Sequence, residues 1–568
     1  MGKSRVTRSN GDSQSKNHKK PKKPKKPRNV TTTAKDGVGE FERVEAALDQ
    51  PTIWKLEREL PGPAATGSPR KLPEIFYPMM EILCGVFGSY RGGQSALQYE
   101  PTWEWFCDLM AYMHCKYNPD LEEYDVGKLK ATNCLIAADW VYAREHWCKA
   151  YVHRLVEIAR EDAAMIALEL GYADPDEQIP SMVGRGLIKT GPNNLSRGRA
   201  MFGDGKVTRE VGCRHRLLTP EEALAYLRQR HPEKEPSKDD IEKLRMACVV
   251  DRSTKGMLPK EELKGGASVY KTGKKDPKTK RNEIVIGYKT AFIGVRGNHS
   301  NDEVILDVRP VDGSEAAVAT DMAIAAKRQL PGLLALCYDG ALTGVYLRLL
   351  AREHVIGISP IAAKSVTKDR HGDDVRTEKS GFLAVMSHDR EGHKCVHTYH
   401  HHGGAVVEVQ LDANGKQTKH YLPDPKIELR TSSKRIYVVY YPTCTINPDV
   451  PPIKLQELRF NIAEDELAGA VANISENVRA LPPGSDIYDA VYGWREAAEN
   501  YNQQSDNAKY MNRARATTAE RAYQGQAALM INKNGLARRL HYERLGMSPP
   551  AETRIKGNWP TGDLAPVA

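Results

Sequence analysis

The chain has 568 residues, of which 40% are hydrophobic and 27% are charged, and its formal net charge is +10. These values exclude a wholly disordered protein and predict a folded, soluble one, with two to four domains rather than a single core. No apolar run approaches the roughly 20 residues that a membrane-spanning helix needs, and no apolar segment follows the basic N-terminus as in a secretory signal. The ten cysteines form no CxxC pair, which predicts reduced thiols in a cytosol.

Residues 1–70 are rich in Lys, Pro, Gly, Ser and Thr. The run from Lys16 to Arg28 (KNHKKPKKPKKPR) carries much of the positive excess, and its prolines prevent helix formation. We expect a flexible, disordered arm that attracts polyanions; a tail that only increases solubility is the alternative. The charge favours affinity for nucleic acid without indicating which one.

Residues 71–195 have a helical pattern. The stretch from Trp147 to Leu170 keeps apolar residues at spacings of three and four. Its aromatic side chains, and those before it, are predicted to be core rather than ligand-stacking residues: Trp103, Trp105, Phe106, Trp140 and Trp147. We expect an all-α domain, and its position suggests binding of DNA ends, although it has no diagnostic helix-turn-helix spacing.

Residues 196–361 alternate between strands and helices. Predicted strands cover 200–211, 283–297, 303–311, 333–339 and 355–361, and predicted helices cover 313–330 and 341–354. This order is typical of an α/β domain with a mixed sheet and covering helices.

Residues 362–452 return to strands and turns. The Asn414-Gly415 pair predicts a two-residue hairpin turn, and Lys434 to Pro442 is another strand. Helices are expected to resume at Lys454 and continue through 453–546, followed by a loose tail over 547–568. The α/β domain is therefore interrupted by a β-rich block.

Three acidic residues stand out by their position. Asp339 ends the apolar strand LLALCYD, where a ligand-binding or catalytic group is common at the rim of a sheet; capping of the next helix is the alternative. Asp204 lies between Gly203 and Gly205, which permit either a close backbone approach or a simple turn. Asp251, at the end of the strand MACVVD, competes with Asp204 for the same role.

A fourth acid belongs to a predicted helix. Tyr492, Arg495 and Glu499 fall at positions i, i+3 and i+7, so they share one helical face. The arginine and the glutamate could form a surface ion pair. They could also bind different ligands, the arginine a phosphate and the carboxylate a metal ion.

The Y-x2-R-x3-E spacing of Tyr492, Arg495 and Glu499 resembles the signature of DDE transposases of bacterial insertion sequences. GDGKV around Asp204 and YDGALTG around Asp339 resemble the first and second aspartate motifs of that family, and GYKTAFIGVRG resembles its second strand. The resemblance covers roughly Met201 to Asn534. It departs from the family where a lysine is expected, because Asp506 occupies that position and Lys509 is the nearest substitute.

The resemblance implies a ribonuclease-H-like catalytic domain whose β-strand insertion precedes the last acid. It implies a transposase that cuts the ends of a mobile element and joins them to target DNA, using two Mg²⁺ ions, or Mn²⁺ in their place. Asp204, Asp339 and Glu499 would be the catalytic metal ligands, with Asp251 as the alternative first aspartate, and Tyr492 and Arg495 would grip a phosphate. We expect action on DNA in the cytoplasm, in association with the nucleoid, no membrane, and a homodimer when assembled on DNA.

Two other functions remain open from the sequence. A repurposed, non-catalytic transposase-derived DNA-binding protein is the first alternative, and a ribonuclease-H-like nuclease without strand transfer is the second. Zinc could be read into HKCVHTYHHHGG, which contains His393, Cys395, His397, His400, His401 and His402, but a polar strand and turn is the expected structure. The CRHR segment at Cys213 to Arg216 could contact phosphate or form a solvated turn.

Overall fold

The structure of the chain is a computed structural model. It describes residues 39–60, 72–87, 90–132, 148–173, 182–183, 197–210, 214–263, 265–275, 282–299, 301–361, 364–368, 374–390, 392–411, 414–430, 435–444, 451–464, 474–508, 515–516 and 518–550. The basic run at 16–28, Trp140, Trp147, Cys213, Lys509 and the last 18 positions of the expected tail, 551–568, lie outside these residues. None of the described helices is both long enough and apolar enough to cross a membrane.

The N-terminal region is helical, as expected, but begins earlier. Its helices are α1 (Glu40–Leu48), α2 (Pro51–Glu59), α3 (Phe76–Val86), α4 (Tyr90–Leu97), α5 (Glu100–Tyr117), α6 (Val126–Ala131) and α8 (Cys148–Glu169). The expected arm therefore does not extend to residue 70, because Leu48, Ile53 and Trp54 of α1 and α2 are buried in the core. Trp103 and Phe106 are buried as predicted.

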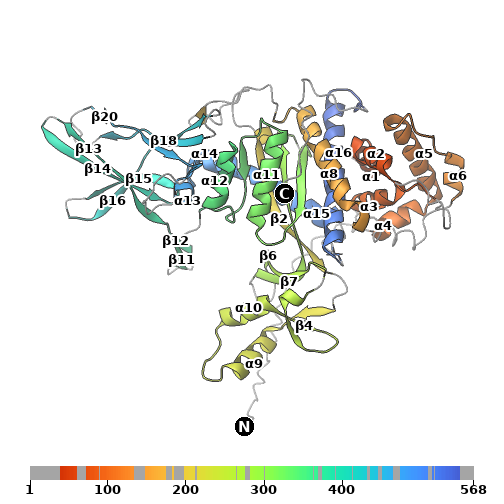
Figure 1. Cartoon of the computed structure of the whole chain (residues 1–568), viewed down its shortest axis with the longest axis horizontal. Coiled ribbons are helices and arrows are strands. Elements are labelled where there is room, and N and C mark those ends of the chain that lie inside the picture. The colour runs from red at the N-terminus through yellow and green to blue at the C-terminus, as the bar shows by residue number, and fades with distance from the viewer. Residues whose placement is uncertain are drawn as a thin grey trace, which may run out of the picture.

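The last long helix, α16 (Ala519–Arg544), packs against α1, α3 and α8 and against the central sheet. Figure 1 shows it between the N-terminal helices and the strands. One hydrophobic core runs from Val44 to Ala537 and includes Phe202 and Phe292 of the sheet. The N-terminal helices thus share a core with the α/β domain.

The central sheet is mixed. Its strands are β2 (Ala200–Glu210), β6 (Ser268–Lys275), β7 (Asn282–Arg296), β8 (Glu303–Pro310), β9 (Ala335–Cys337), β10 (Ile356–Ile358) and β22 (Arg515–Ala516). The order is β10-β9-β2-β7-β6, with β8 also paired to β7 and β22 to β2. β7 runs antiparallel to β2, β6 and β8, whereas β9 runs parallel to β2 and β10.

The helices of this domain connect its strands in the predicted order. α11 (Glu315–Gln329) lies between β8 and β9, and α12 (Gly344–Arg352) lies between β9 and β10. The 3-10 turn η3 (Arg197–Arg199) precedes β2. The mixed α/β class expected for residues 196–361 is confirmed.

A small subdomain that the sequence did not suggest is inserted between β2 and β6. Its elements are β3 (His215–Leu217), α9 (Pro220–Arg230), α10 (Lys238–Ala247), β4 (Cys248–Asp251), β5 (Met257–Pro259) and η4 (Lys260–Glu262). It projects from the sheet (Figure 1). The predicted strand at Met246 to Asp251 begins only at Cys248, because α10 includes Met246 and Ala247.

The β-rich block lies beyond β10. One sheet contains β13 (Ser380–Arg390), β14 (His393–His402), β15 (Ala405–Leu411) and β16 (Gln417–Tyr421). Gly415 lies between β15 and β16 with a φ of 73°, but the predicted two-residue turn is wrong, because five positions separate the paired residues Leu411 and Gln417. A second contains β1 (Met182–Val183), β17 (Lys426–Arg430), β18 (Arg435–Tyr440) and β21 (Leu458–Asn461). The remaining strands are the pairs β11 (Ser365–Lys368) with β12 (Asp374–Thr377) and β19 (Thr443–Cys444) with β20 (Ile453–Lys454).

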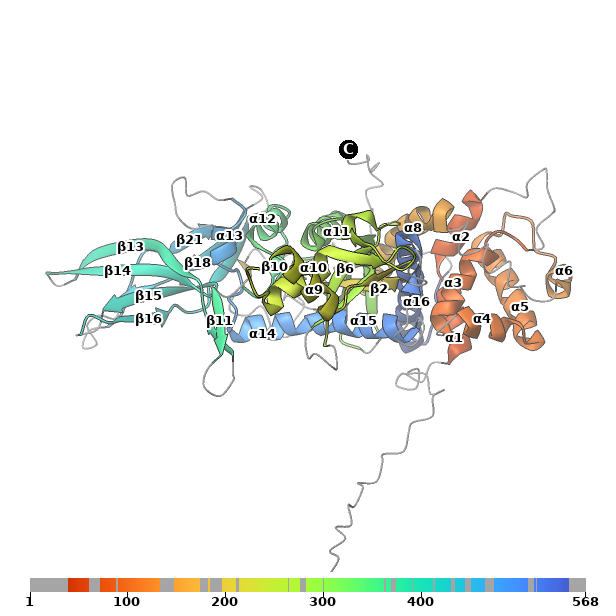
Figure 2. The same ribbon diagram turned by 90° about the horizontal axis from the view of Figure 1, so that it is seen from below.

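Helices do not resume at Lys454, as the sequence had suggested, because β20 and β21 continue the sheets to Asn461. They resume with α13 (Ile474–Asn477), α14 (Asp486–Tyr492), the 3-10 turn η6 (Gly493–Arg495) and α15 (Glu496–Ala508). A second hydrophobic core joins the β-rich block to β9, β10 and α14. Figure 2 shows α14 and α15 running along one side of the molecule, from the β-rich block toward α16.

Candidate functional site

Asp204 and Asp339 are brought together by the pairing of β2 with β9. Phe202 of β2 is the register partner of Cys337, the last residue of β9. Each aspartate lies two residues beyond its member of this pair, so both carboxylates leave the same edge of the sheet. Asp204, Asp339 and Glu315 each offer an oxygen that lies within 4.8 Å of the other two.

The two glycines around Asp204 permit a close approach rather than a turn, since β2 continues through both of them. A Cβ atom on Gly203 would lie 2.9 Å from the Phe292 carbonyl oxygen and 2.9 Å from the Tyr338 ring. A Cβ atom on Gly205 would lie 2.5 Å from the Glu315 carboxylate. The GDG sequence therefore leaves room for the third acid beside the first.

Glu315 is the first residue of α11. Its Oε1 accepts a hydrogen bond from the Tyr338 hydroxyl at 2.5 Å, and its Oε2 forms an ion pair with Lys289. The side chain is 12% exposed. These two partners fix the carboxylate toward Asp204 and balance its charge.

Arg495 and Asn502 approach Asp204 from the helical segment on the other side. Arg495 Nη2 lies 3.4 Å from Asp204 Oδ2, and Asn502 Nδ2 donates to the same oxygen at 2.9 Å. The backbone N–H of Gly205 donates to Asp204 Oδ1 at 2.9 Å. Lys206 Nζ donates to the Asn502 carbonyl oxygen at 3.1 Å, which ties α15 to β2. Asp204 is thus held by β2, η6 and α15 at once.

Burial raises the pKa of Asp204, and the neighbouring charges of Glu315 and Asp339 raise it further, against the opposing effect of Arg495. Burial lowers the pKa of Arg495, but the surrounding negative charges, Asp204 first, outweigh it and raise that pKa. Burial also raises the pKa of Tyr338, and Glu315 adds to the shift. Groups with shifted pKa values of this kind cluster at functional sites.

Tyr492, Arg495 and Glu499 lie on successive elements rather than on one continuous α-helix. Tyr492 ends α14 and stacks on Tyr488 with ring centroids 5.1 Å apart, and Arg495 ends the 3-10 turn η6. Burial raises the pKa of Tyr492. Glu499 Oε1 lies 3.3 Å from Arg495 Nη1, and the glutamate side chain is 69% exposed. Arg495 therefore lies between Asp204 and Glu499, and Glu499 is not a member of the three-carboxylate group.

Asp251 occupies a different sheet, the three-stranded β3-β4-β5. Its Oδ1 accepts hydrogen bonds from the backbone N–H and the hydroxyl of Ser253 at 2.7 and 2.5 Å, and its Oδ2 lies 3.1 Å from Arg214 Nε. Bonds from Ser253, then the charge of Arg214, hold the pKa of Asp251 well below its usual range. Asp251 stabilises a turn, and Asp204 is the residue that meets Asp339.

Carboxylate oxygens are the ligands that Mg²⁺ and Mn²⁺ prefer. The acid cluster therefore has the chemistry of a divalent-cation site, and Arg495 adds a bidentate donor suited to a phosphate. Comparison with protein-family models and with curated proteins finds no match.

Sequence reasoning missed Glu315 and Asn502. Acidic residues are common in the first turn of any helix, so Glu315 had no distinguishing signal. Asn502 belongs to the helix that was singled out, one turn beyond Glu499, but no spacing rule marks an asparagine as an aspartate's partner.

Proposed function

We propose that the chain is a DDE-type transposase that cleaves the ends of a mobile element and transfers them to target DNA. In this proposal β2, β7, β8, β9 and β10 with α11 and α12 form a ribonuclease-H-like domain, and the β-rich block is its insertion. One observation carries the proposal: Asp204 and Asp339 meet at one sheet edge, and Arg495 of the Y-x2-R-x3-E segment contacts Asp204 there.

The donor set fits the implied metal ions, because the group contains only hard carboxylate oxygens. Asp204 and Asp339 of this group would hold Mg²⁺ or Mn²⁺. Glu499, which lies outside the group and is paired with Arg495, would be the third acid. When bound, two such ions stabilise the charge that develops on the attacking and leaving oxygens of a phosphodiester.

The protein's own groups prepare this site. Asn502 and the Gly205 N–H each donate to one oxygen of Asp204, so its carboxylate has a fixed orientation. Arg495 favours the ionised form of that carboxylate. Arg495 contacts Asp204 and Glu499 through one nitrogen each, whereas a DNA phosphate could accept from both nitrogens at once. Movement of Arg495 to that phosphate would release Glu499 from the ion pair.

A repurposed, non-catalytic DNA-binding protein is the second candidate. The exposure of Glu499 and its pairing with Arg495 favour it, because a third metal ligand would be expected to face the other two. So does Asp506, which stands where the family has a lysine. Both candidate functions involve binding to DNA. Only the transposase is expected to form a homodimer on a pair of element ends.

The test is cleavage of plasmid DNA that carries the sequences flanking the chain's own gene. The transposase proposal expects strand cleavage at the element ends with Mg²⁺ or Mn²⁺, and its loss in Asp339→Ala and Glu499→Ala. DNA binding without cleavage, together with equal behaviour of wild type and both variants, would support the second candidate instead.

A further inference from the structure

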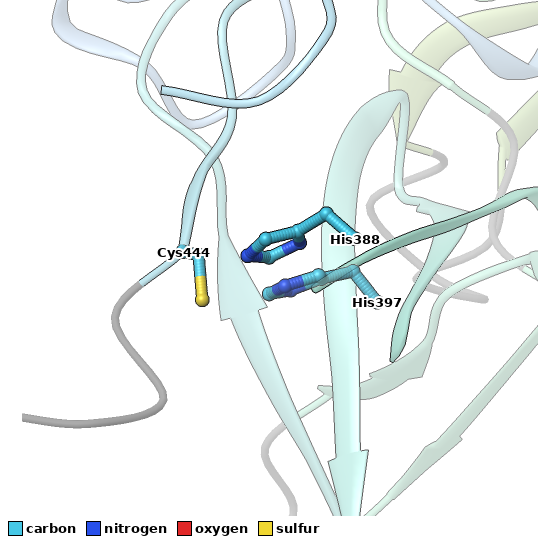
Figure 3. Close-up of side chains that lie close together, drawn as sticks. All are labelled: His388, His397 and Cys444. Atoms are coloured by element: carbon cyan, nitrogen blue, oxygen red, sulfur yellow. The ribbon is translucent and has the colours of Figure 1, made fainter. Parts of the chain in front are cut away.

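A second group of possible metal ligands lies in the β-rich block, far along the chain from the acids. His388 of β13, His397 of β14 and Cys444 of β19 each offer a ligand atom within 4.8 Å of the other two. The imidazole rings stack with centroids 5.3 Å apart and an interplanar angle of 13°. Figure 3 shows both rings with their ends toward the Cys444 sulfur.

Three imidazole nitrogens of this group are buried. Nδ1 and Nε2 of His388 and Nε2 of His397 have no hydrogen-bond partner among the described residues. His397 is 1% exposed and Cys444 is fully buried. Buried polar atoms are nearly always paired, so three unpaired nitrogens beside a thiol indicate a missing ligand.

His397 is also oriented by a carboxylate. Its Nδ1 lies 2.7 Å from Glu408 Oε1, and Glu408 of β15 is itself only 6% exposed. A carboxylate on one ring nitrogen directs the other nitrogen toward a metal and increases its basicity. The arrangement leaves Nε2 of His397 as the coordinating atom.

We propose that His388, His397 and Cys444 bind a zinc ion that fastens the β13–β14 ribbon to the β19–β20 pair. Two imidazoles and a thiolate suit Zn²⁺ and not Mg²⁺, so this ion is distinct from those of the acid cluster. Cys395 lies opposite His388 in the register and two residues from His397, so it is on the same face of the β13–β14 ribbon.

This site differs from the one that the histidine run of the sequence suggested. That run forms β14 and the turn after it, as expected of a polar strand. Only His397 of the run takes part. His388 comes from the preceding strand and Cys444 from a segment 47 positions after His397, so no spacing within the run could indicate them.

The test uses the full-length protein, purified without chelator, and measures metal content by mass spectrometry. We expect about one zinc ion per chain in wild type and none in His388→Ala or Cys444→Ser. The matched control is His400→Ala, because His400 is on the opposite face of β14; it should retain its zinc. Substitution of Co²⁺ should give a thiolate-to-cobalt charge-transfer band that is absent from Cys444→Ser.

Glu408→Gln keeps all three ligands and removes only the negative charge beside His397 Nδ1. It therefore tests the proposal even if the ligand variants do not fold. Its zinc affinity, measured by competition with a colorimetric chelator, should fall roughly 10- to 100-fold. Wild type without zinc and without a cobalt–thiolate band would overturn the proposal. So would folded His388→Ala and Cys444→Ser proteins that bind zinc as wild type does, or an unchanged affinity in Glu408→Gln.

Discussion

The Arg495 guanidinium contacts the Asp204 carboxylate, with Nη2 3.4 Å from Oδ2. This contact fixes the turn between α14 and α15 against the central strand β2. Because the other terminal nitrogen of Arg495 holds Glu499 at 3.3 Å, one side chain links the sheet-edge acid to the helical acid. A cation that enters here must compete with this arginine for Asp204, and a phosphate must compete with Asp204 and Glu499 for the arginine.

The first prediction concerns the identity of the paired aspartates. Asp204→Asn and Asp339→Asn should each lower DNA cleavage by at least roughly 10³-fold, because a neutral amide is a much weaker ligand for Mg²⁺ than a carboxylate. Cleavage is measured on the plasmid with flanking sequences, with circular dichroism to verify folding. Both variants should still bind DNA.

The control for this pair is Asp251→Asn. Asp251 holds the Ser253 turn and does not face Asp339, so its substitution should lower the melting temperature but leave the cleavage rate of folded protein near that of wild type. Loss of cleavage in Asp251→Asn, with full activity in Asp204→Asn, would show that Asp251 is the first catalytic aspartate.

The second prediction separates Glu499 from Glu315. Glu499→Gln should abolish cleavage and change the unfolding free energy by less than ~0.5 kcal/mol, because the Glu499 side chain is 69% exposed. Glu315→Gln should cost ~1–3 kcal/mol, because Lys289 and Tyr338 would lose a buried charged partner. Chemical denaturation and the cleavage assay measure the two effects. The reverse pattern, with an inactive Glu315→Gln and an active Glu499→Gln, would assign the third acid to Glu315.

The third prediction is a pH dependence of the metal-free protein. The pKa of Asp204 is raised in the folded state, chiefly by burial, so its ionised form opposes folding at neutral pH and its neutral form does not. Asp204→Asn should therefore have the higher melting temperature at pH 7 in chelator. The difference should shrink as the pH falls through the folded-state pKa of Asp204, because wild type then becomes neutral at this position. A difference that is constant with pH would contradict the raised pKa.

The fourth prediction concerns Gly205. Gly205→Ala should cost ~1–3 kcal/mol and displace Glu315, because the added Cβ would lie 2.5 Å from the Glu315 carboxylate. The matched control is Gly273→Ala in β6, where a Cβ meets nothing within 4 Å. Denaturation curves should show a loss for Gly205→Ala alone. Equal stability of the two variants would mean that Glu315 moves aside freely.

The α/β elements could be predicted because their patterns are strong and local. β7 and β8 are dense in β-branched residues between turn signals, and α11 is an alanine-rich segment bounded by Ser314 and Pro331. Asp339 could be singled out because it ends an apolar strand, and Asp204 because glycines flank it on both sides. The two carboxylates lie close together because β2 pairs with β9, and local sequence periodicity does not predict this long-range pairing.

Other parts of the chain could not be predicted for identifiable reasons. α9 and α10 bury few side chains, so their charged sequences have only a weak apolar stripe. The short strands β20 and β21 lack the length for a clear alternation. The packing of α16 against both the N-terminal helices and the sheet gave no local signal, so the separate N-terminal domain expected over 71–195 shares its core with the α/β domain.

The fifth prediction concerns the ion pair between Arg538 of α16 and Glu169 of α8. Arg538 Nε and Nη2 lie 2.8 and 3.3 Å from the two carboxylate oxygens, and both side chains are almost fully buried. Arg538→Met should cost ~3–5 kcal/mol, because it leaves the Glu169 charge buried without its partner. The double variant Arg538→Met with Glu169→Leu should recover much of this loss, since it removes both charges together. Chemical denaturation gives the coupling between the two positions.

The same pair bears on how the molecule unfolds. Because Arg538 and Glu169 join the N-terminal helices to α16, which also packs on β8, wild type should lose the N-terminal helices and the sheet in a single transition. Tyrosine and tryptophan fluorescence and far-UV circular dichroism should then give the same midpoint. In Arg538→Met both midpoints should fall together. Two separate transitions in wild type, with only the first sensitive to Arg538→Met, would show that the N-terminal helices fold apart from the sheet, and the shared core would then contribute little to cooperativity.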